Sequence, residues 1–228
     1  MMCIAILTAA AGVVAASSLA AGGIGYVSGN RPGVAVTDPL SMRYVANGYN
    51  DANNQVSVRY WSERQNVTLA TPLVVSVLAP VSFPSVVTSH AENSLLTIAA
   101  GTAVNSHNIY FDPLNSATVE AVFRFDSPIL GLITNERNNA ANDHFMASDY
   151  LILPSVPAAN IPGAHFGARG LEMSSSERVT FVDANTVRIN WTASNPGDQM
   201  RIITQVPAPG TLGCAGLALF AGTRRRRR

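Results

Sequence analysis

The sequence predicts an all-β fold: an antiparallel β-sandwich of the jelly-roll or lectin-like kind. Two observations lead to this prediction. Apolar residues recur with period two more often than with period 3.6 along most of the chain. Short apolar runs are separated by Pro, Gly, Asn and Asp at intervals of roughly ten residues, a spacing typical of sandwiches. Helix signals are nearly absent from the same region, which disfavours a mixed α/β fold.

The clearest strand pair is a hairpin near the end of the chain. Segments 179–182 and 186–191 flank Asp183-Ala184-Asn185, a composition typical of turns. Segments 56–61 and 119–125 alternate apolar and polar residues, as half-buried strands do. Further strands are expected at 67–78, 95–98, 108–111, 129–134 and 199–204, and one short helix is expected at 139–148.

An export segment is expected before the β domain. Residues 4–16 form an apolar run, and Ser18-Leu19-Ala20 supplies the small residues of a cleavage site after Ala20. Residues 1–20 are therefore interpreted as a signal peptide, helical before its removal. The β-sandwich domain is expected to occupy residues 21–205.

A three-part tail follows at residues 206–228. Val206, Pro207, Ala208 and Pro209 favour an extended backbone that a protease can reach. Residues 210–223 are apolar or small, and as a helix they would reach about 21 Å, against a hydrocarbon core of about 30 Å. A basic cluster ends the chain: Arg224, Arg225, Arg226, Arg227 and Arg228.

This tail resembles the PEP-CTERM sorting tail of proteins from Gram-negative and related bacteria. The resemblance implies that an exosortase, an integral-membrane cysteine peptidase, recognises residues 206–209 and cuts there. Residues 210–223 would insert transiently into the inner membrane, and the arginine cluster would retain the chain until cleavage. Ala208 stands where the family has an acidic residue. The stretches 125–134, 147–151, 169–172 and 194–204 resemble a β-rich domain that recurs in front of such tails.

The composition narrows the classes of partner and site. Without its last five residues the chain has ten arginines, no lysine and 14 acidic residues, a net charge of about −4. Such a body has no basic stripe for phosphates, which argues against nucleic-acid binding. Cys3 and Cys214 lie in the terminal apolar segments, so the body offers no disulfide, no cysteine zinc site and no cysteine nucleophile.

Two tryptophans motivate an alternative function. Trp61 and Trp191 each end an alternating segment, and exposed rings there would form a platform for sugars. The protein would then be a carbohydrate-binding module in the exopolysaccharide layer. Core packing is the commoner fate of tryptophans in strands, so both interpretations stay open.

A secreted hydrolase is the second alternative. It would need two converging carboxylates, and the candidates are Asp126, Asp143, Asp149, Glu172, Glu177 and Asp198. Asp149 and Glu172 are better explained by a structural role. With Arg169, which is close to Glu172 in the sequence, they could form a buried salt bridge that fixes two loops. The four histidines lack metal-ligand spacing and no G-x-S-x-G motif occurs, so neither a metal site nor a catalytic residue is predicted. No cofactor is expected, except that the oxygen-rich loop 50–54 has the composition of a Ca²⁺ site.

The sequence therefore predicts an exported protein of the cell surface or extracellular matrix, with no evident catalytic activity. Its expected partners are the membrane, an exosortase-type enzyme and exopolysaccharide.

Overall fold

The computed structural model describes residues 23–44, 56–89, 96–134, 144–161, 170–171, 173, 177–194 and 197–206. Within them the chain is built from β-strands, with one four-residue helix, α1 (His144–Ala147). This confirms the all-β class. The predicted signal peptide, the 50–54 loop and the tail after Val206 lie outside the described residues.

The strands are short in the first half of the chain and longer in the second. They are β1 (Ile24–Gly29), β2 (Gly33–Ala35), β3 (Val58–Ser62), β4 (Val67–Thr68), β5 (Leu73–Val75), β6 (Val77–Leu78), β7 (Ser85–Val87), β8 (Leu96–Ile98), β9 (Ala103–Phe111), β10 (Ala117–Phe125), β11 (Ile129–Ile133), β12 (Arg178–Asp183), β13 (Thr186–Ala193) and β14 (Asp198–Gln205). Single 3₁₀ turns lie at Pro39–Ser41, Asp149–Leu151 and Ala158–Asn160.

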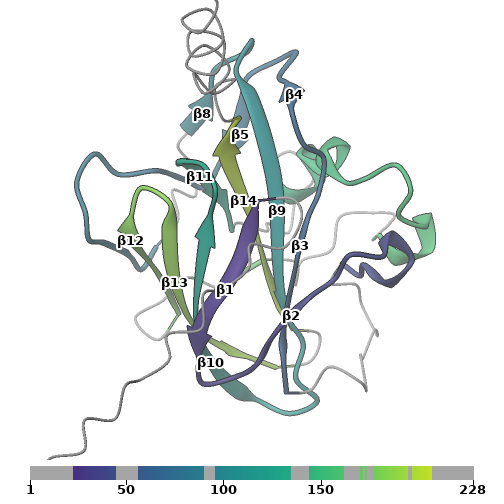
Figure 1. Cartoon of the computed structure of the whole chain (residues 1–228), viewed down its shortest axis with the longest axis vertical. Coiled ribbons are helices and arrows are strands. Elements are labelled where there is room, and N and C mark those ends of the chain that lie inside the picture. Colours follow the sequence, from purple (N-terminus) through teal and green to yellow (C-terminus); the bar gives the residue numbers. More distant parts are fainter. Residues whose placement is uncertain are drawn as a thin grey trace, which may run out of the picture.

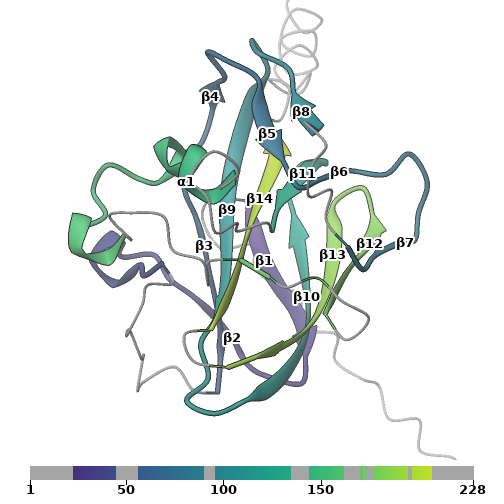
Figure 2. The same ribbon diagram turned by 180° about the vertical axis from the view of Figure 1, so that it is seen from behind.

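Most of these strands join two large sheets (Figure 1 and Figure 2). The first sheet has five strands in the order β1-β10-β13-β12-β7. The second has seven strands, in the order β2-β3-β9-β14-β11-β6 with β4 also paired to β9. β5 and β8 form a separate two-stranded ribbon. The recorded pairings are antiparallel except that of β2 with β3.

The five-stranded sheet has one buried face and one exposed face. In β10 the odd-numbered residues from Val119 to Phe125 are buried, while Glu120 and Arg124 are exposed. β12 and β13 follow the same alternation. Because side chains on a strand point alternately to the two faces, a sheet with one wet face produces the period-two pattern seen in the sequence.

The seven-stranded sheet is covered on both faces. Residues 104–111 of β9 and 198–204 of β14 are all buried. One face contributes Ile109 and Ile202 to a core shared with Phe123 and Ile189 of the five-stranded sheet. The opposite face packs against the β5–β8 ribbon, α1 and the chain segments around residues 42–44 and 151–156. This outer layer buries polar side chains of β9 and β14 that would otherwise face water.

Most predicted strands are confirmed, with shifted ends. Segment 67–78 is divided into β4, β5 and β6, because Pro72 cannot donate to a ladder and Ser76 turns its hydroxyl to the Thr134 amide at 3.0 Å. Strand 108–111 extends back to Ala103. β1, β2 and β7 were not predicted. The predicted helix 139–148 is limited to α1 within the described residues.

No helix within the described residues is both long enough and apolar enough to cross a bilayer.

Candidate functional site

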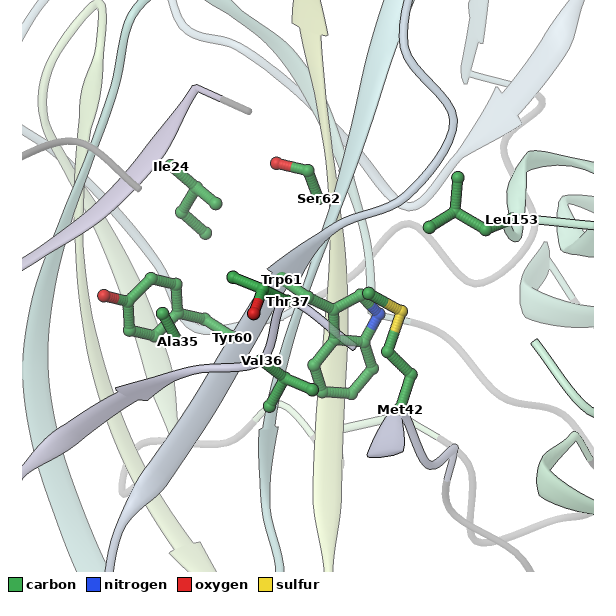
Figure 3. Close-up of a pocket in the computed structure, with 9 residues that line it drawn as sticks. All are labelled: Ile24, Ala35, Val36, Thr37, Met42, Tyr60, Trp61, Ser62 and Leu153. Atoms are coloured by element: carbon green, nitrogen blue, oxygen red, sulfur yellow. The ribbon is translucent and has the colours of Figure 1, made fainter. Parts of the chain in front are cut away.

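A cavity of about 300 Å³ opens where the chain leaves β2 and passes alongside β3 (Figure 3). Its walls come from β1, β2 and the residues that follow it, β3, and the segment around residue 153. The lining residues are Ile24, Ala35, Val36, Thr37, Met42, Tyr60, Trp61, Ser62 and Leu153. Because Tyr60 and Trp61 are consecutive, they point to opposite faces of the seven-stranded sheet, and the cavity lies at the edge that joins both faces.

The cavity lining is mainly apolar. Its polar side-chain groups are the hydroxyls of Thr37, Tyr60 and Ser62 and the indole N–H of Trp61, and it contains no carboxylate, imidazole or guanidinium. A hollow of about 330 Å³ on the other side of residues 35–37 does include Arg59 and Asp38. The Asp38 carboxylate is already engaged, since it accepts hydrogen bonds from the Leu40 N–H at 3.0 Å and the Ser41 hydroxyl at 3.1 Å.

Trp61 connects the cavity wall to the interior. Its indole Nε1–H donates to the Tyr44 hydroxyl at 3.2 Å, and the two rings meet edge to face with centroids 5.5 Å apart. The Tyr44 hydroxyl in turn donates to Glu63 Oε1 at 2.8 Å. The hydrogen-bond chain therefore runs from the cavity wall to a buried carboxylate.

That carboxylate forms a buried ion pair. Arg201 Nε donates to Glu63 Oε2 at 2.7 Å, and Nη2 donates to Oε1 at 2.9 Å, with both side chains fully buried. Such a two-pronged contact is the strongest geometry available to a guanidinium and a carboxylate. Ser106 adds a hydroxyl donor to Glu63 Oε2 at 2.5 Å.

The remaining donors of Arg201 bind the segment that covers the sheet. Nη1 donates to the Phe145 carbonyl at 3.3 Å and to the Ser148 hydroxyl, and Nη2 lies 3.5 Å from Asp149 Oδ1. The guanidinium carbon also lies 5.6 Å from the centroid of the Phe145 ring. The network thus ties β3, β9 and β14 to α1 and the following turn, which is a structural role.

The electrostatics of the network favour a charged pair. Burial lowers the pKa of Arg201, because it disfavours the charged guanidinium. The Glu63 carboxylate, together with Asp149 and Tyr44, raises the pKa by a larger amount, so the pKa of Arg201 is above its usual value. Burial, reinforced by the Glu63 charge, holds the pKa of Tyr44 well above its usual value. Arg201 stays protonated and Tyr44 stays a neutral donor at physiological pH.

His107 lies on the opposite, inward side of β9. Its Nδ1 is 3.2 Å from the Ser62 hydroxyl, its Nε2 is 3.1 Å from the Thr204 hydroxyl, and its ring packs on Phe125. Burial lowers the pKa of His107 to about 3. The imidazole is therefore neutral near pH 7 and serves as a buried hydrogen-bonding group.

Neither tryptophan provides a sugar platform. Trp61 is 2% exposed and Trp191 is fully buried in the core shared by the two large sheets. A ring that stacks on a sugar must present a face to solvent, which neither ring does. The glycan contacts predicted at Trp61 and Trp191 therefore lose their basis.

Several of the other predicted site residues lie outside the described residues. They are Ala20, Pro207, Ala208, Pro209, Arg224–Arg228, Asp143, Arg169 and Glu172, so the predicted ion pair with Glu172 is not visible. The candidate carboxylates Glu177 and Asp198 are both buried. Asp149 is placed beside Arg201, a partner not predicted from the sequence. Asp126 is exposed at the end of β10 and accepts a hydrogen bond from the Ser127 hydroxyl.

The described residues contain no group of three or more His, Cys, Asp or Glu side chains arranged to hold a metal ion. The buried pair Glu63–Arg201 was missed, although one signal was present. A single arginine stands inside the apolar strand Met200-Arg201-Ile202-Ile203, and a charge in such a position needs a buried partner.

Comparisons with known proteins add no family to this picture. No protein-family model matches the chain, and neither curated proteins nor solved structures give a match.

Proposed function

We propose that this protein is exported and sorted to the cell surface or extracellular matrix through its C-terminal tail. The observation that carries the proposal is the order of the tail. The Val206–Pro209 motif, an apolar stretch and five arginines follow one another directly, and a signal-like segment stands at the other end of the chain. The membrane and an exosortase-type peptidase are the partners in this account.

The limits of the β domain agree with that division of the chain. β1 begins at Ile24, a few residues after the proposed cleavage site at Ala20. β14 ends at Gln205, directly before the motif. Removal of residues 1–20 and of the tail would leave intact every strand that the structure describes, as a processed surface protein requires.

We also infer that the two large sheets form a sandwich of the jelly-roll kind. Both contribute side chains to one apolar core, and the chain passes repeatedly between them. Such a domain folds without disulfides when its core is large enough, which suits a body that lacks cysteine. The proposed role is binding or structural.

The residues that line the cavity support neither of the two alternative functions, the secreted hydrolase and the carbohydrate-binding module. A secreted hydrolase would use a pair of carboxylates, and the cavity beside β3 is lined by none. A module that stacks sugars on Trp61 or Trp191 would use exposed rings, and both are buried.

Expression of the full chain with and without an exosortase-type peptidase tests the proposal. With the peptidase, we expect a shortened protein at the cell surface; without it, an unshortened protein in the inner membrane. Replacing Pro207 and Pro209 by alanine should block the shortening, whereas the control Pro72→Ala, at an exposed position before β5, should not. An unchanged C-terminus in both hosts would contradict the sorting claim.

A further inference from the structure

Three arginines form a diagonal row on the exposed face of the five-stranded sheet. Arg124 of β10 lies opposite Thr186 of β13, so Arg188 is two residues further along β13. Arg188 lies opposite Thr180 of β12, and Arg178 is again one strand over and two residues further in the same direction. All three side chains are exposed.

The register fixes the spacing of this row. Diagonal neighbours on adjacent antiparallel strands are about 7–8 Å apart, so the first and last arginines are about 15 Å apart. β10, β13 and β12 are adjacent in the sheet, which Figure 1 and Figure 2 show from two sides. The relative positions of the three arginines are therefore set by strand pairing and do not depend on the conformation of a loop.

Hydrogen-bonding groups surround the arginines. The outward positions on the same three strands hold Thr118, Thr180, Asn190 and Thr192, together with the apolar Val122 and Val182. The hydroxyls of Thr118 and Thr192 lie 3.2 Å apart.

Two acidic residues lie beside the row on these strands. Asp183 is exposed at the end of β12, opposite Thr186, which in turn pairs with Arg124. Glu120 is 3.9 Å from Arg188, in a pair whose side chains are both half exposed. Exposed pairs of this kind are worth little and exchange readily for another anion.

The charge of this face is opposite to that of the body as a whole. Before its terminal arginines the chain has a net charge of about −4, yet this row carries three positive charges against the two acidic residues Glu120 and Asp183. An anionic polymer would be repelled by the body in general and attracted here. We therefore expect an anionic polymer to approach the protein at this face of the five-stranded sheet.

We propose that this arginine row binds an anionic polysaccharide that bears carboxylates. A guanidinium binds a carboxylate in a two-pronged fashion, and threonine and asparagine can bond sugar hydroxyls. Three cations spread over about 15 Å fit an extended polymer better than a single small anion. Nucleic acid fits less well, because the outward positions of β10, β12 and β13 hold no aromatic side chain on which bases would stack.

Binding to immobilised alginate tests this proposal, with the full chain purified in mild detergent and Arg224–Arg228 replaced by glutamine in the reference chain and in every variant, because the terminal arginines would themselves bind a polyanion. We expect binding that weakens as salt is raised, and no comparable binding to neutral dextran. Arg178→Gln and Arg188→Gln should each weaken binding severalfold, and the triple variant with Arg124→Gln should abolish it. Arg64→Gln is the matched control, since it removes one exposed positive charge outside this sheet. Arg188→Lys should restore part of the lost binding.

Three results would overturn the proposal: equal binding of the triple variant and the reference chain, equal binding to alginate and dextran, or binding to single-stranded DNA as tight as to alginate. Thermal unfolding of each variant verifies that the fold is retained. The choice of a polysaccharide rests on the proposed surface location, but the binding assay does not depend on export. If the chain binds alginate but is not sorted in the expression experiment, the proposed surface location is wrong and the proposed binding by the arginine row still holds.

Discussion

Arg201 and Glu63 show how one pair of side chains can hold several elements together. The pair is buried, two-pronged and supplied with further partners on both sides, so few of its polar atoms lose hydrogen bonds on leaving water. Desolvation of two charges is costly, and a complete hydrogen-bond shell is the condition under which such a pair is tolerated. The pair fixes the covering segment in place.

Replacing Glu63 by glutamine should destabilise the protein strongly. The change leaves the Arg201 guanidinium buried without its main counter-charge, which typically costs about 3–5 kcal/mol. Glu120→Gln is the matched control, because it breaks the exposed pair with Arg188, and it should cost no more than about 1 kcal/mol. Urea unfolding of both variants measures the difference. Similar losses in the two variants would contradict the structural role of the buried pair.

His107 predicts how stability depends on pH. Its pKa is about 3 in the folded protein and about 6.5 when unfolded, so below pH 6.5 the unfolded state binds the proton more readily. Stability from this residue is therefore complete above pH 6.5 and is lost as pH falls toward 3. The loss should reach about 2 kcal/mol at pH 5. His107→Gln should flatten this part of the profile, and an identical slope in wild type and variant would exclude the assignment.

At the scale of elements, strands with one wet face were predictable and strands buried on both faces were less so. Segments 119–125 and 186–191 alternate because water lies on one side of them. The first half of β9 was missed because Asn105, Ser106 and His107 look like a polar loop. Ser106 is satisfied by Glu63 and His107 by Thr204, partners far away in the chain that no local pattern reveals.

The candidate site was less predictable than the fold. Its cavity depends on residues 35–37 passing alongside β3, and no local signal marks the parallel pairing of the three-residue β2 with β3. Trp61 was singled out as a possible exposed platform, but the segments around residues 42–44 and 152–156 cover it. Whether a ring on the sheet is buried depends on which segments pack over it. The alternation of residues within one strand carries no information about those segments.

The turn before β14 gives a prediction about a single glycine. Gly197 has φ +82°, and an added Cβ would lie 2.7 Å from the Asp112 Cα. Gly101 has φ +81° but open space around it. Gly101→Ala should therefore cost about 1–2 kcal/mol for the backbone alone. Gly197→Ala should cost a further 1–3 kcal/mol or so from the clash. Thermal unfolding of both variants compares them, and equal losses would rule out the close contact.

At the scale of the whole molecule, the two large sheets differ in how they are covered and in which groups they carry. The seven-stranded sheet is enclosed on both sides and contains the ionic network and His107. The five-stranded sheet leaves one face open, and that face carries the arginine row. The enclosed sheet provides rigidity, and the open face is the surface we propose for binding a matrix polymer.

The sorting proposal requires that this β domain reach the cell surface and lose both terminal segments. Intact-mass measurement of the protein recovered from the surface of its native host distinguishes a processed chain from an unprocessed one. We expect a chain that begins after Ala20 and ends within residues 206–209, with the apolar stretch and the arginine cluster removed. Recovery of the chain with its arginine cluster still attached would contradict the sorting proposal.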